Sequence, residues 1–219
     1  MTAVWISLSV GAAATALSLA PGTAVAWVLE RSRTPVRGLL HALVYLPLVL
    51  PPVVTGLVLL RIFSPRGLLG RALETIGLPV AFHWLGAVVA AAVVGFPLLV
   101  AGISLAFRSV DPRLETLSRS LGRGPWATFF RITLPLAYPG ILAGAVLCFA
   151  RGLGEFGATI VLAGRIPGET ETLSLAVYAA LERPGAEAHT TALVIFSIAI
   201  GVAGILVARI LDRRRRTES

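Results

Sequence analysis

Residues 115–135 read ETLSRSLGRGPWATFFRITLP, and this stretch decides how the rest of the chain is interpreted. It is the longest segment of polar character that lies between strongly apolar ones. Leucines recur in and just before it at the spacing of a short amphipathic helix: Leu114, Leu117 and Leu121. Gly122 and Gly124-Pro125 then end the helix. Between membrane spans, such a helix has no core of its own, so its apolar face lies on the membrane, packs beneath the spans or docks into a partner protein.

The composition is that of a membrane protein. The 219 residues are 56% hydrophobic and 14% charged, with a mean hydropathy of +0.86, which a soluble domain of this size does not show. The net charge is +8 and every basic residue is arginine. These arginines cluster beside apolar runs, so membrane topology explains them and a nucleic-acid partner is rejected. We therefore expect an all-α integral membrane protein in contact with the lipid bilayer.

Five apolar runs are long enough to cross a bilayer, which takes about 20 residues. The predicted spans within a single transmembrane domain, residues 1–219, are 4–29, 39–62, 84–107, 134–153 and 190–211. A sixth span is an open alternative. Residues 158–163 are too short to cross alone and are interpreted as a re-entrant or interfacial piece.

Arginine placement predicts the orientation. If loops 30–38 and 108–133 and the tail after residue 211 are cytoplasmic, that side holds 13 of the 19 basic residues, with Arg209 counted among them. Short cytoplasmic loops carry such an excess, so the C-terminus is predicted to be cytoplasmic.

The second span contains LPLVLPPVVTGLVLL, residues 46–60. Pro47, Pro51 and Pro52 do not fit one straight helix, and a broken helix is tolerated in a membrane only where it packs in protein or lines a cavity. Two interpretations stay open. The break is a packing kink, or it forms a wall of a translocation path in which Thr55 and Gly56 offer a hydroxyl and close backbone approach.

The spacing of the opening stretch resembles the cytoplasmic loop of bacterial ABC importer permeases. Their pattern is Glu-Ala-Ala, three residues, Gly, nine residues, then Ile-x-Leu-Pro, and its second half is matched by Gly122, Ile132 and Leu134-Pro135. The first half departs, because residues 116–118 are Thr-Leu-Ser and Glu115 stands one place early. The resemblance implies a type I importer architecture and a cytoplasmic coupling helix that contacts an ATPase through Glu115, Leu117, Leu121, Gly122, Ile132, Leu134 and Pro135.

The resemblance becomes more specific elsewhere. Residues 46–56 and 121–173, above all GEFGATI at 154–160 and IPGET at 166–170, are similar to the permease subunit of molybdate ABC transporters. This implies a bacterial inner-membrane homodimer, ABC ATPase subunits that bind the ATP, and a periplasmic or lipid-anchored molybdate-binding protein. Tungstate and sulfate or thiosulfate remain alternative substrates, because sulfate permeases share a related GEFG stretch.

A path for a tetrahedral dianion needs hydroxyls, backbone N–H groups or a distant positive charge. The possible path residues are Pro51, Pro52, Thr55, Gly56, Ser104, Glu155 and Thr159. For the three hydroxyl residues, Thr55, Ser104 and Thr159, packing at helix contacts is the favoured interpretation. Arg151 and Glu155 are four apart and are predicted to pair on one helix face.

Other classes of protein fit less well. An ATP-independent secondary transporter or channel would need ionisable residues within the spans, and these are nearly absent. An enzyme would need clustered histidines or carboxylates near one membrane face, and the sequence shows no such cluster. Cys148 is the single cysteine, so a cysteine metal cluster is excluded. Gly152, Gly154 and Gly157 match GxGxxG, but no strand precedes them, so we interpret them as a turn or a close contact. We expect no cofactor in this chain.

Overall fold

A computed structural model describes residues 2–31, 35–182, 191–199 and 201–202, and every regular element within these ranges is a helix. The elements in chain order are α1 (Thr2–Arg31), α2 (Arg37–Val49), α3 (Pro52–Phe63), α4 (Gly70–Thr75), α5 (Trp84–Ser109), α6 (Pro112–Ser120), α7 (Pro125–Thr128), the π-helix η1 (Phe129–Thr133), α8 (Leu134–Leu153), α9 (Gly157–Leu162) and α10 (Leu173–Leu181). Residues 191–199 and 201–202 are also helical. The all-α fold predicted from the composition is confirmed for these residues.

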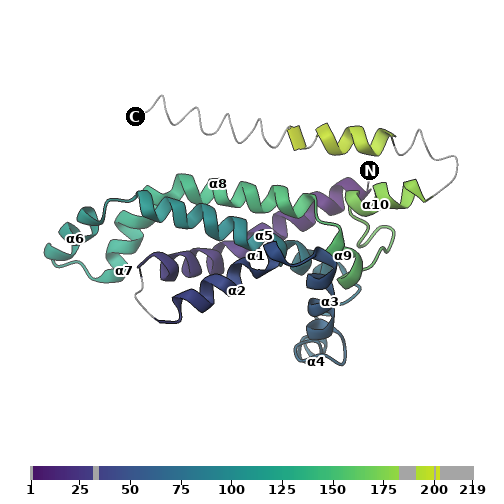
Figure 1. The fold of residues 1–219 in the computed structure, drawn as a ribbon, viewed down its shortest axis with the longest axis horizontal. Coiled ribbons are helices and arrows are strands. Elements are labelled where there is room, and N and C mark those ends of the chain that lie inside the picture. Colours follow the sequence, from purple (N-terminus) through teal and green to yellow (C-terminus); the bar gives the residue numbers. More distant parts are fainter. Residues whose placement is uncertain (1, 32–34, 183–190, 200, 203–219) are drawn as a thin grey trace.

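Three long helices form the body of the molecule and lie side by side in Figure 1. They are α1, α5 and the continuous run from α7 through α8, and each is long and apolar enough to cross a membrane. α1 runs unbroken through Pro21. The predicted spans 4–29, 84–107 and 134–153 therefore fall on helices of the required length and hydropathy.

Small residues bring α5 and α8 together. A Cβ atom added at Gly102 would lie 2.6 Å from the Cα of Gly144, and one added at Gly95 would lie 2.8 Å from the Sγ of Cys148. Lipid tails are as apolar as leucine side chains, so membrane helices associate through this kind of close van der Waals packing. The main buried cluster lies along the same contact, with Leu99, Ile103 and Phe107 fully buried.

The predicted second span is two helices. α2 and α3 meet at an angle of 116°, and the pair counts as a fourth span only if it is one broken crossing. Leu50 and Pro51 are extended, with ψ of 140° and 134°, and Pro52 begins α3. Proline disfavours helical backbone in the residue before it and suits the first helical position, so the consecutive prolines place the break here. Pro47 lies inside α2.

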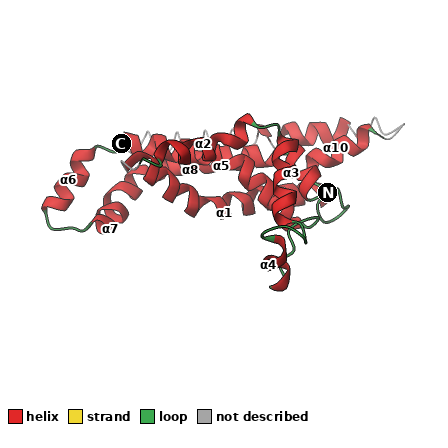
Figure 2. Cartoon of the chain, turned by 60° about the horizontal axis from the view of Figure 1, so that its bottom comes forward, coloured by secondary structure: helices red, strands yellow, loops and turns green. Residues whose placement is uncertain are grey.

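Figure 2 shows that several of the shorter helices lie at the two ends of the bundle formed by the long helices. α6 and α7 project from one end, whereas α3, α4 and α10 lie toward the other, where α3 packs on α9. The predicted short piece at 158–163 is α9, which is buried against α3 and α5. Half of the fifth predicted span cannot be compared, because residues 190, 200 and 203–211 lie outside the described residues.

Candidate functional site

The first half of the loop between α5 and α8 is a capped helix. Asp111 Oδ1 accepts a hydrogen bond from the backbone N–H of Arg113 at 2.8 Å, and Pro112 fills the first helical position. An aspartate N-cap satisfies one of the free amides at a helix start, and proline at the next position has no amide to satisfy. α6 therefore begins where its sequence specifies.

α6 ends in a Schellman motif centred on Gly122. The backbone N–H of Gly122 bonds to the carbonyl of Arg119 at 3.0 Å, and that of Arg123 bonds to Ser118 at 3.2 Å. Gly122 has φ of +80°, the left-handed conformation that this motif uses and that glycine adopts without strain. The glycine C-cap predicted from the sequence is confirmed.

The outward face of this loop is apolar. Leu117 is 60% exposed, Leu121 is 74% exposed and Trp126 is 68% exposed, and Leu114 and Phe130 are exposed as well. We call these five residues the α6–α7 face. On its inner side the loop is held by aromatic contacts, in which Trp126 stacks on Trp27 of α1 and Phe129 meets Phe107 of α5 edge-on. The exposed side chains therefore sit on a fixed base.

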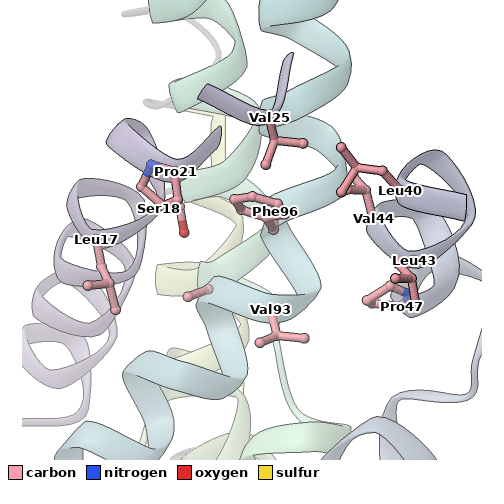
Figure 3. Close-up of a pocket in the computed structure, with 11 residues that line it drawn as sticks. Leu17, Ser18, Pro21, Val25, Leu40, Leu43, Val44, Pro47, Val93 and Phe96 are labelled. Carbon is pink, nitrogen blue, oxygen red and sulfur yellow. The ribbon is translucent and has the colours of Figure 1, made fainter. Parts of the chain in front are cut away.

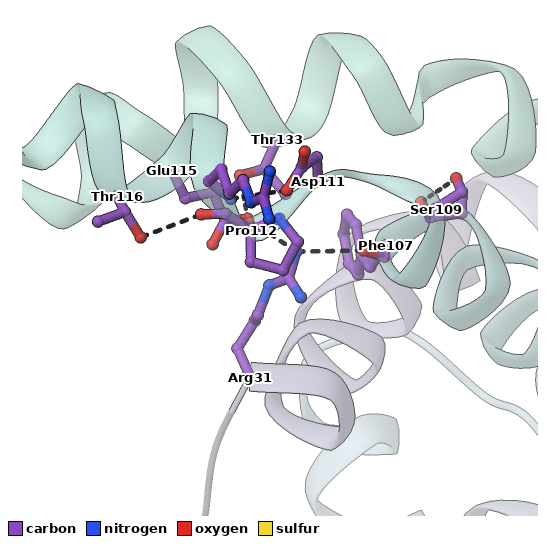
Figure 4. Close-up of polar contacts among 10 residues, drawn as sticks. Arg31, Phe107, Ser109, Asp111, Pro112, Glu115, Thr116 and Thr133 are labelled. Atoms are coloured by element: carbon purple, nitrogen blue, oxygen red, sulfur yellow. Dashed lines mark hydrogen bonds and ion pairs between the residues drawn. The ribbon is translucent and has the colours of Figure 1, made fainter.

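Glu115 belongs to the inner side of the loop, as Figure 4 shows. Its Oε1 atom accepts from Arg31 Nη2 and from the Thr133 hydroxyl, each at 2.8 Å, and the carboxyl side chain is only 13% exposed. Arg31 Nη2 also donates to the Phe107 carbonyl at 3.1 Å. Arg31 and Thr133 were not predicted as site residues. The only signals in the sequence are the position of Arg31 at the end of a span and of Thr133 inside the Ile-x-Leu-Pro pattern.

The remaining loop residues mark the beginning of α8. Ile132 and Leu134 are half-buried, Leu134 packs against the main core, and Pro135 lies in the first turn of α8, where proline is tolerated. Of the residues predicted to couple to an ATPase, Leu117 and Leu121 are thus outward-facing, Gly122 shapes the loop, and the others connect the loop to the bundle.

The residues predicted to line a path gather mostly at the contact of α3 with α9. A Cβ added at Gly56 would lie 2.8 Å from both the Cα and the carbonyl oxygen of Ala158, and one added at Gly157 would lie 2.7 Å from Pro52 Cβ. The close contact expected of Gly157 is confirmed. Thr55 and Thr159 are buried beside this contact, and the Thr55 hydroxyl has no hydrogen-bond partner within the described structure.

Glu155 lies beside the same contact and connects the end of α8 to the start of α9. It is 2% exposed, its Oε1 accepts from the Ala158 backbone N–H at 2.7 Å, and its Oε2 lies 2.8 Å from Arg151 Nη1 without hydrogen-bond geometry. The predicted Arg151–Glu155 pair is confirmed. Its placement on one helix face was wrong, because α8 ends at Leu153 and Glu155 caps the start of α9 instead.

Ser104 is not part of this group. It lies in α5, ten residues after Val94, and Val94 packs with the residues of α9. Ten helical residues rise about 15 Å, so Ser104 is about 15 Å from Val94 along the helix axis. The structure therefore unites the other path residues at one end of the bundle and leaves Ser104 in the last third of α5, towards the opposite end.

A cavity of about 370 Å³ lies between α1, α2 and α5 (Figure 3). None of the predicted path residues lines it. Its lining is almost wholly apolar: Leu17, Ser18, Pro21, Val25, Leu40, Leu43, Val44, Pro47, Ala92, Val93 and Phe96. Because a dianion would lose its hydration there and gain at most the Ser18 hydroxyl, this cavity does not suit an oxyanion.

The tight contact at Gly56 gives a stability prediction. Gly56→Ala forces α3 away from the α9 backbone, and overpacking of this kind costs about 1–3 kcal/mol. In detergent we expect the purified variant to unfold about 5 °C lower, read by circular dichroism during heating. Gly38→Ala is the control, because a Cβ there meets nothing within 4 Å. Equal unfolding temperatures for the two variants would show that α3 and α9 do not approach this closely.

Known proteins of similar sequence and fold agree with this architecture. The family described as "Binding-protein-dependent transport system inner membrane component" matches residues 22–217. The molybdenum transport system permease protein ModB of Escherichia coli is 48% identical over 98% of this chain and 94% of its own length, and that of Haemophilus influenzae is 44% identical over the same shares. The sulfate transport system permease protein CysT of E. coli is 39% identical over 74% of this chain and 58% of its own length. A bacterial ABC transporter that imports alginate has the same fold, with a TM-score of 0.75 at 20% identity, covering 97% of this chain and 78% of that one.

Spanning helices packed through small residues, with an apolar loop face at one end, define the chain as an integral membrane permease of the ABC importer class. It belongs to the family of binding-protein-dependent transport system inner membrane components. It is a multi-pass inner-membrane protein and a transport subunit.

Proposed function

We propose that this permease carries molybdate across the bacterial cytoplasmic membrane, driven by ATP that a separate subunit hydrolyses. The observation that carries the proposal is the 48% identity to the molybdenum permease of E. coli over almost the whole of both chains. Tungstate, an oxyanion of the same shape and charge, belongs with it as a second substrate.

Sulfate is the second candidate, supported by the similarity to a sulfate permease. That similarity covers only 58% of the sulfate permease's length, whereas the similarity to the molybdenum permease covers 94%. We therefore favour molybdate over sulfate and thiosulfate.

The proposed assembly has two copies of this chain, two ATPase subunits on the cytoplasmic side and a substrate-binding protein on the other. The α6–α7 face supports the position of the ATPase, because exposed leucines and a tryptophan on a fixed base are typical of a protein-binding surface. The C-terminus is then cytoplasmic. A reporter enzyme fused after Ser219 is expected to be active only if it functions in the cytoplasm, and activity of an externally functioning reporter would contradict this orientation.

The path residues at the α3–α9 contact remain predictions in this scheme. Each protomer there supplies hydroxyls and backbone groups, and the Arg151 charge is already paired with Glu155. Weak contacts of this kind fit transient passage of an anion, with tight selection left to the binding protein.

Uptake in cells tests the substrate. Cells that lack this gene, and the same cells with the gene restored, are given labelled molybdate at nanomolar concentration with and without excess sulfate. We expect uptake to return with the gene and to persist under sulfate. Uptake that returns but collapses under sulfate would assign the permease to sulfate, and no recovery would refute oxyanion import.

A further inference from the structure

The carboxylate of Glu115 lies where three parts of the bundle meet. Arg31 is the last residue of α1, Glu115 lies in α6 and Thr133 ends η1. Arg31 and Thr133 both donate a hydrogen bond to the Oε1 atom of Glu115 (Figure 4). Arg31 adds α5 to this junction through the Phe107 carbonyl. One ion pair thus joins the loop to the end of a helix that precedes it by 84 positions in the chain.

The chain itself connects α6 to α5 on one side and, through α7 and η1, to α8 on the other. α1 has no such connection to α6. A displacement of α6 therefore reaches α5 and α8 through the backbone, but reaches α1 through side-chain contacts. Among the described residues, the Arg31–Glu115 pair is the charged contact between α6 and α1, and it is largely shielded from water, with side chains 22% and 13% exposed.

This arrangement differs from a surface contact. The carboxylate points into the protein, whereas Thr116, at the position of the glutamate in the loop pattern described above, is exposed and bonds back to Pro112 of its own helix. The Oε1 atom of Glu115 is therefore engaged by α1 and η1 of the same chain.

The pair is also not optimised for stability. Arg31 Nε is buried without a hydrogen-bond partner in the described structure, and buried ion pairs often contribute little to stability compared with apolar replacements. What such a pair does provide is a fixed relative position of the elements that it joins.

We propose that Arg31 and Glu115 are positioning residues that transmit the movement of α6 to α1, so that ATP hydrolysis is coupled to movement of the first span. This rests on the proposed function, in which an ATPase acts on α6. Loss of the pair leaves the ATPase bound and active but lets α6 move without α1. The complex then hydrolyses more ATP for each molybdate that it transports.

The first test measures ATP hydrolysed per molybdate transported, with the complete complex in proteoliposomes. Arg31→Gln and Glu115→Gln are each expected to raise this ratio about fivefold or more, the usual lower range of an allosteric coupling. Arg31→Lys is expected to keep the wild-type ratio, because one nitrogen, Nη2, makes both contacts and an ammonium group can replace it. A wild-type ratio in both glutamine variants would overturn the proposal.

Arg108→Gln is the matched control. Arg108 pairs with Glu30 at 2.8 and 2.9 Å and joins α5 to α1 at the same end of the bundle without contacting α6. We expect it to leave the ATP-to-molybdate ratio unchanged. A rise equal to that of Arg31→Gln would show that any break at this end uncouples transport, and would also overturn the specific role of the pair.

A second readout does not depend on the substrate. Spin labels at Ala24→Cys in α1 and Ser120→Cys in α6, in a Cys148→Ala background, report the α1–α6 distance in the complex with its ATPase, with and without ATP. We expect one narrow distance in both states, and a broad, ATP-dependent distribution once Arg31→Gln is added. A distribution that stays narrow would overturn the proposal even if molybdate proved to be the wrong substrate, whereas failure of molybdate uptake with the expected label behaviour would refute only the proposed substrate.

Discussion

Gly122→Val and Gly122→Arg are expected to insert normally and to lose at least about nine-tenths of transport. Gly122 has φ of +80°, and a non-glycine residue there costs about 1–2 kcal/mol, with β-branched valine the least suited. That cost changes the equilibrium between the native closing turn of α6 and other conformations by about 5- to 30-fold in favour of the others. The loop then no longer presents its apolar face correctly. Uptake of labelled molybdate and co-purification of the ATPase are the measurements.

The structure offers two matched controls for Gly122. A Cβ at Gly122 or at Gly124 meets nothing within 4 Å, but Gly124 has φ of −69°, which any residue adopts. Gly124→Val should therefore transport normally, and Gly122→Asn should retain most activity because asparagine tolerates the left-handed region. Normal ATPase association and uptake in Gly122→Val and Gly122→Arg would refute the role assigned to this residue.

The second large effect is expected from the α6–α7 face. Leu117→Asp combined with Leu121→Asp places two charges where exposed leucines meet the proposed partner, and burying unpaired charges in an interface is costly. A loss of about 2 kcal/mol corresponds to about a 30-fold loss of binding. We expect the ATPase to be lost on co-purification while the permease remains in the membrane at normal amounts.

Leu68→Asp is the control for this surface. Leu68 is 91% exposed and lies next to α4, away from α6, so the same change there should leave the ATPase bound. Retention of the ATPase by the double leucine variant would show that the subunit docks elsewhere.

Much of the helical plan was predictable because it depends on local sequence. Length and hydropathy locate α1, α5 and α8, the leucine spacing locates α6, and the left-handed cap at Gly122 follows from glycine at a helix end. The break before α3 was also predictable, since consecutive prolines cannot continue a helix. α10 was missed because a nine-residue, largely apolar segment is too short to signal a span.

The tertiary contacts were not predictable from the sequence. Nothing local to Arg31 or Thr133 shows that both bond to Glu115, because the three residues meet only after α1, α6 and η1 have packed. In the same way, Gly56 and Ser104 both looked like path residues, yet only Gly56 lies at the contact of α3 with α9. Hydropathy places residues in helices, whereas the packing of those helices decides which side chains meet.

ATP-dependent accumulation of molybdate in proteoliposomes tests the central claim most directly. Purified permease is reconstituted with its ATPase, the binding protein and labelled molybdate, with ATP or with a non-hydrolysable analogue on the ATPase side. We expect accumulation against a gradient with ATP, none with the analogue, and none when Leu117→Asp and Leu121→Asp are introduced. Equal molybdate flux with and without hydrolysable ATP would contradict it and would identify an ATP-independent transporter or channel instead.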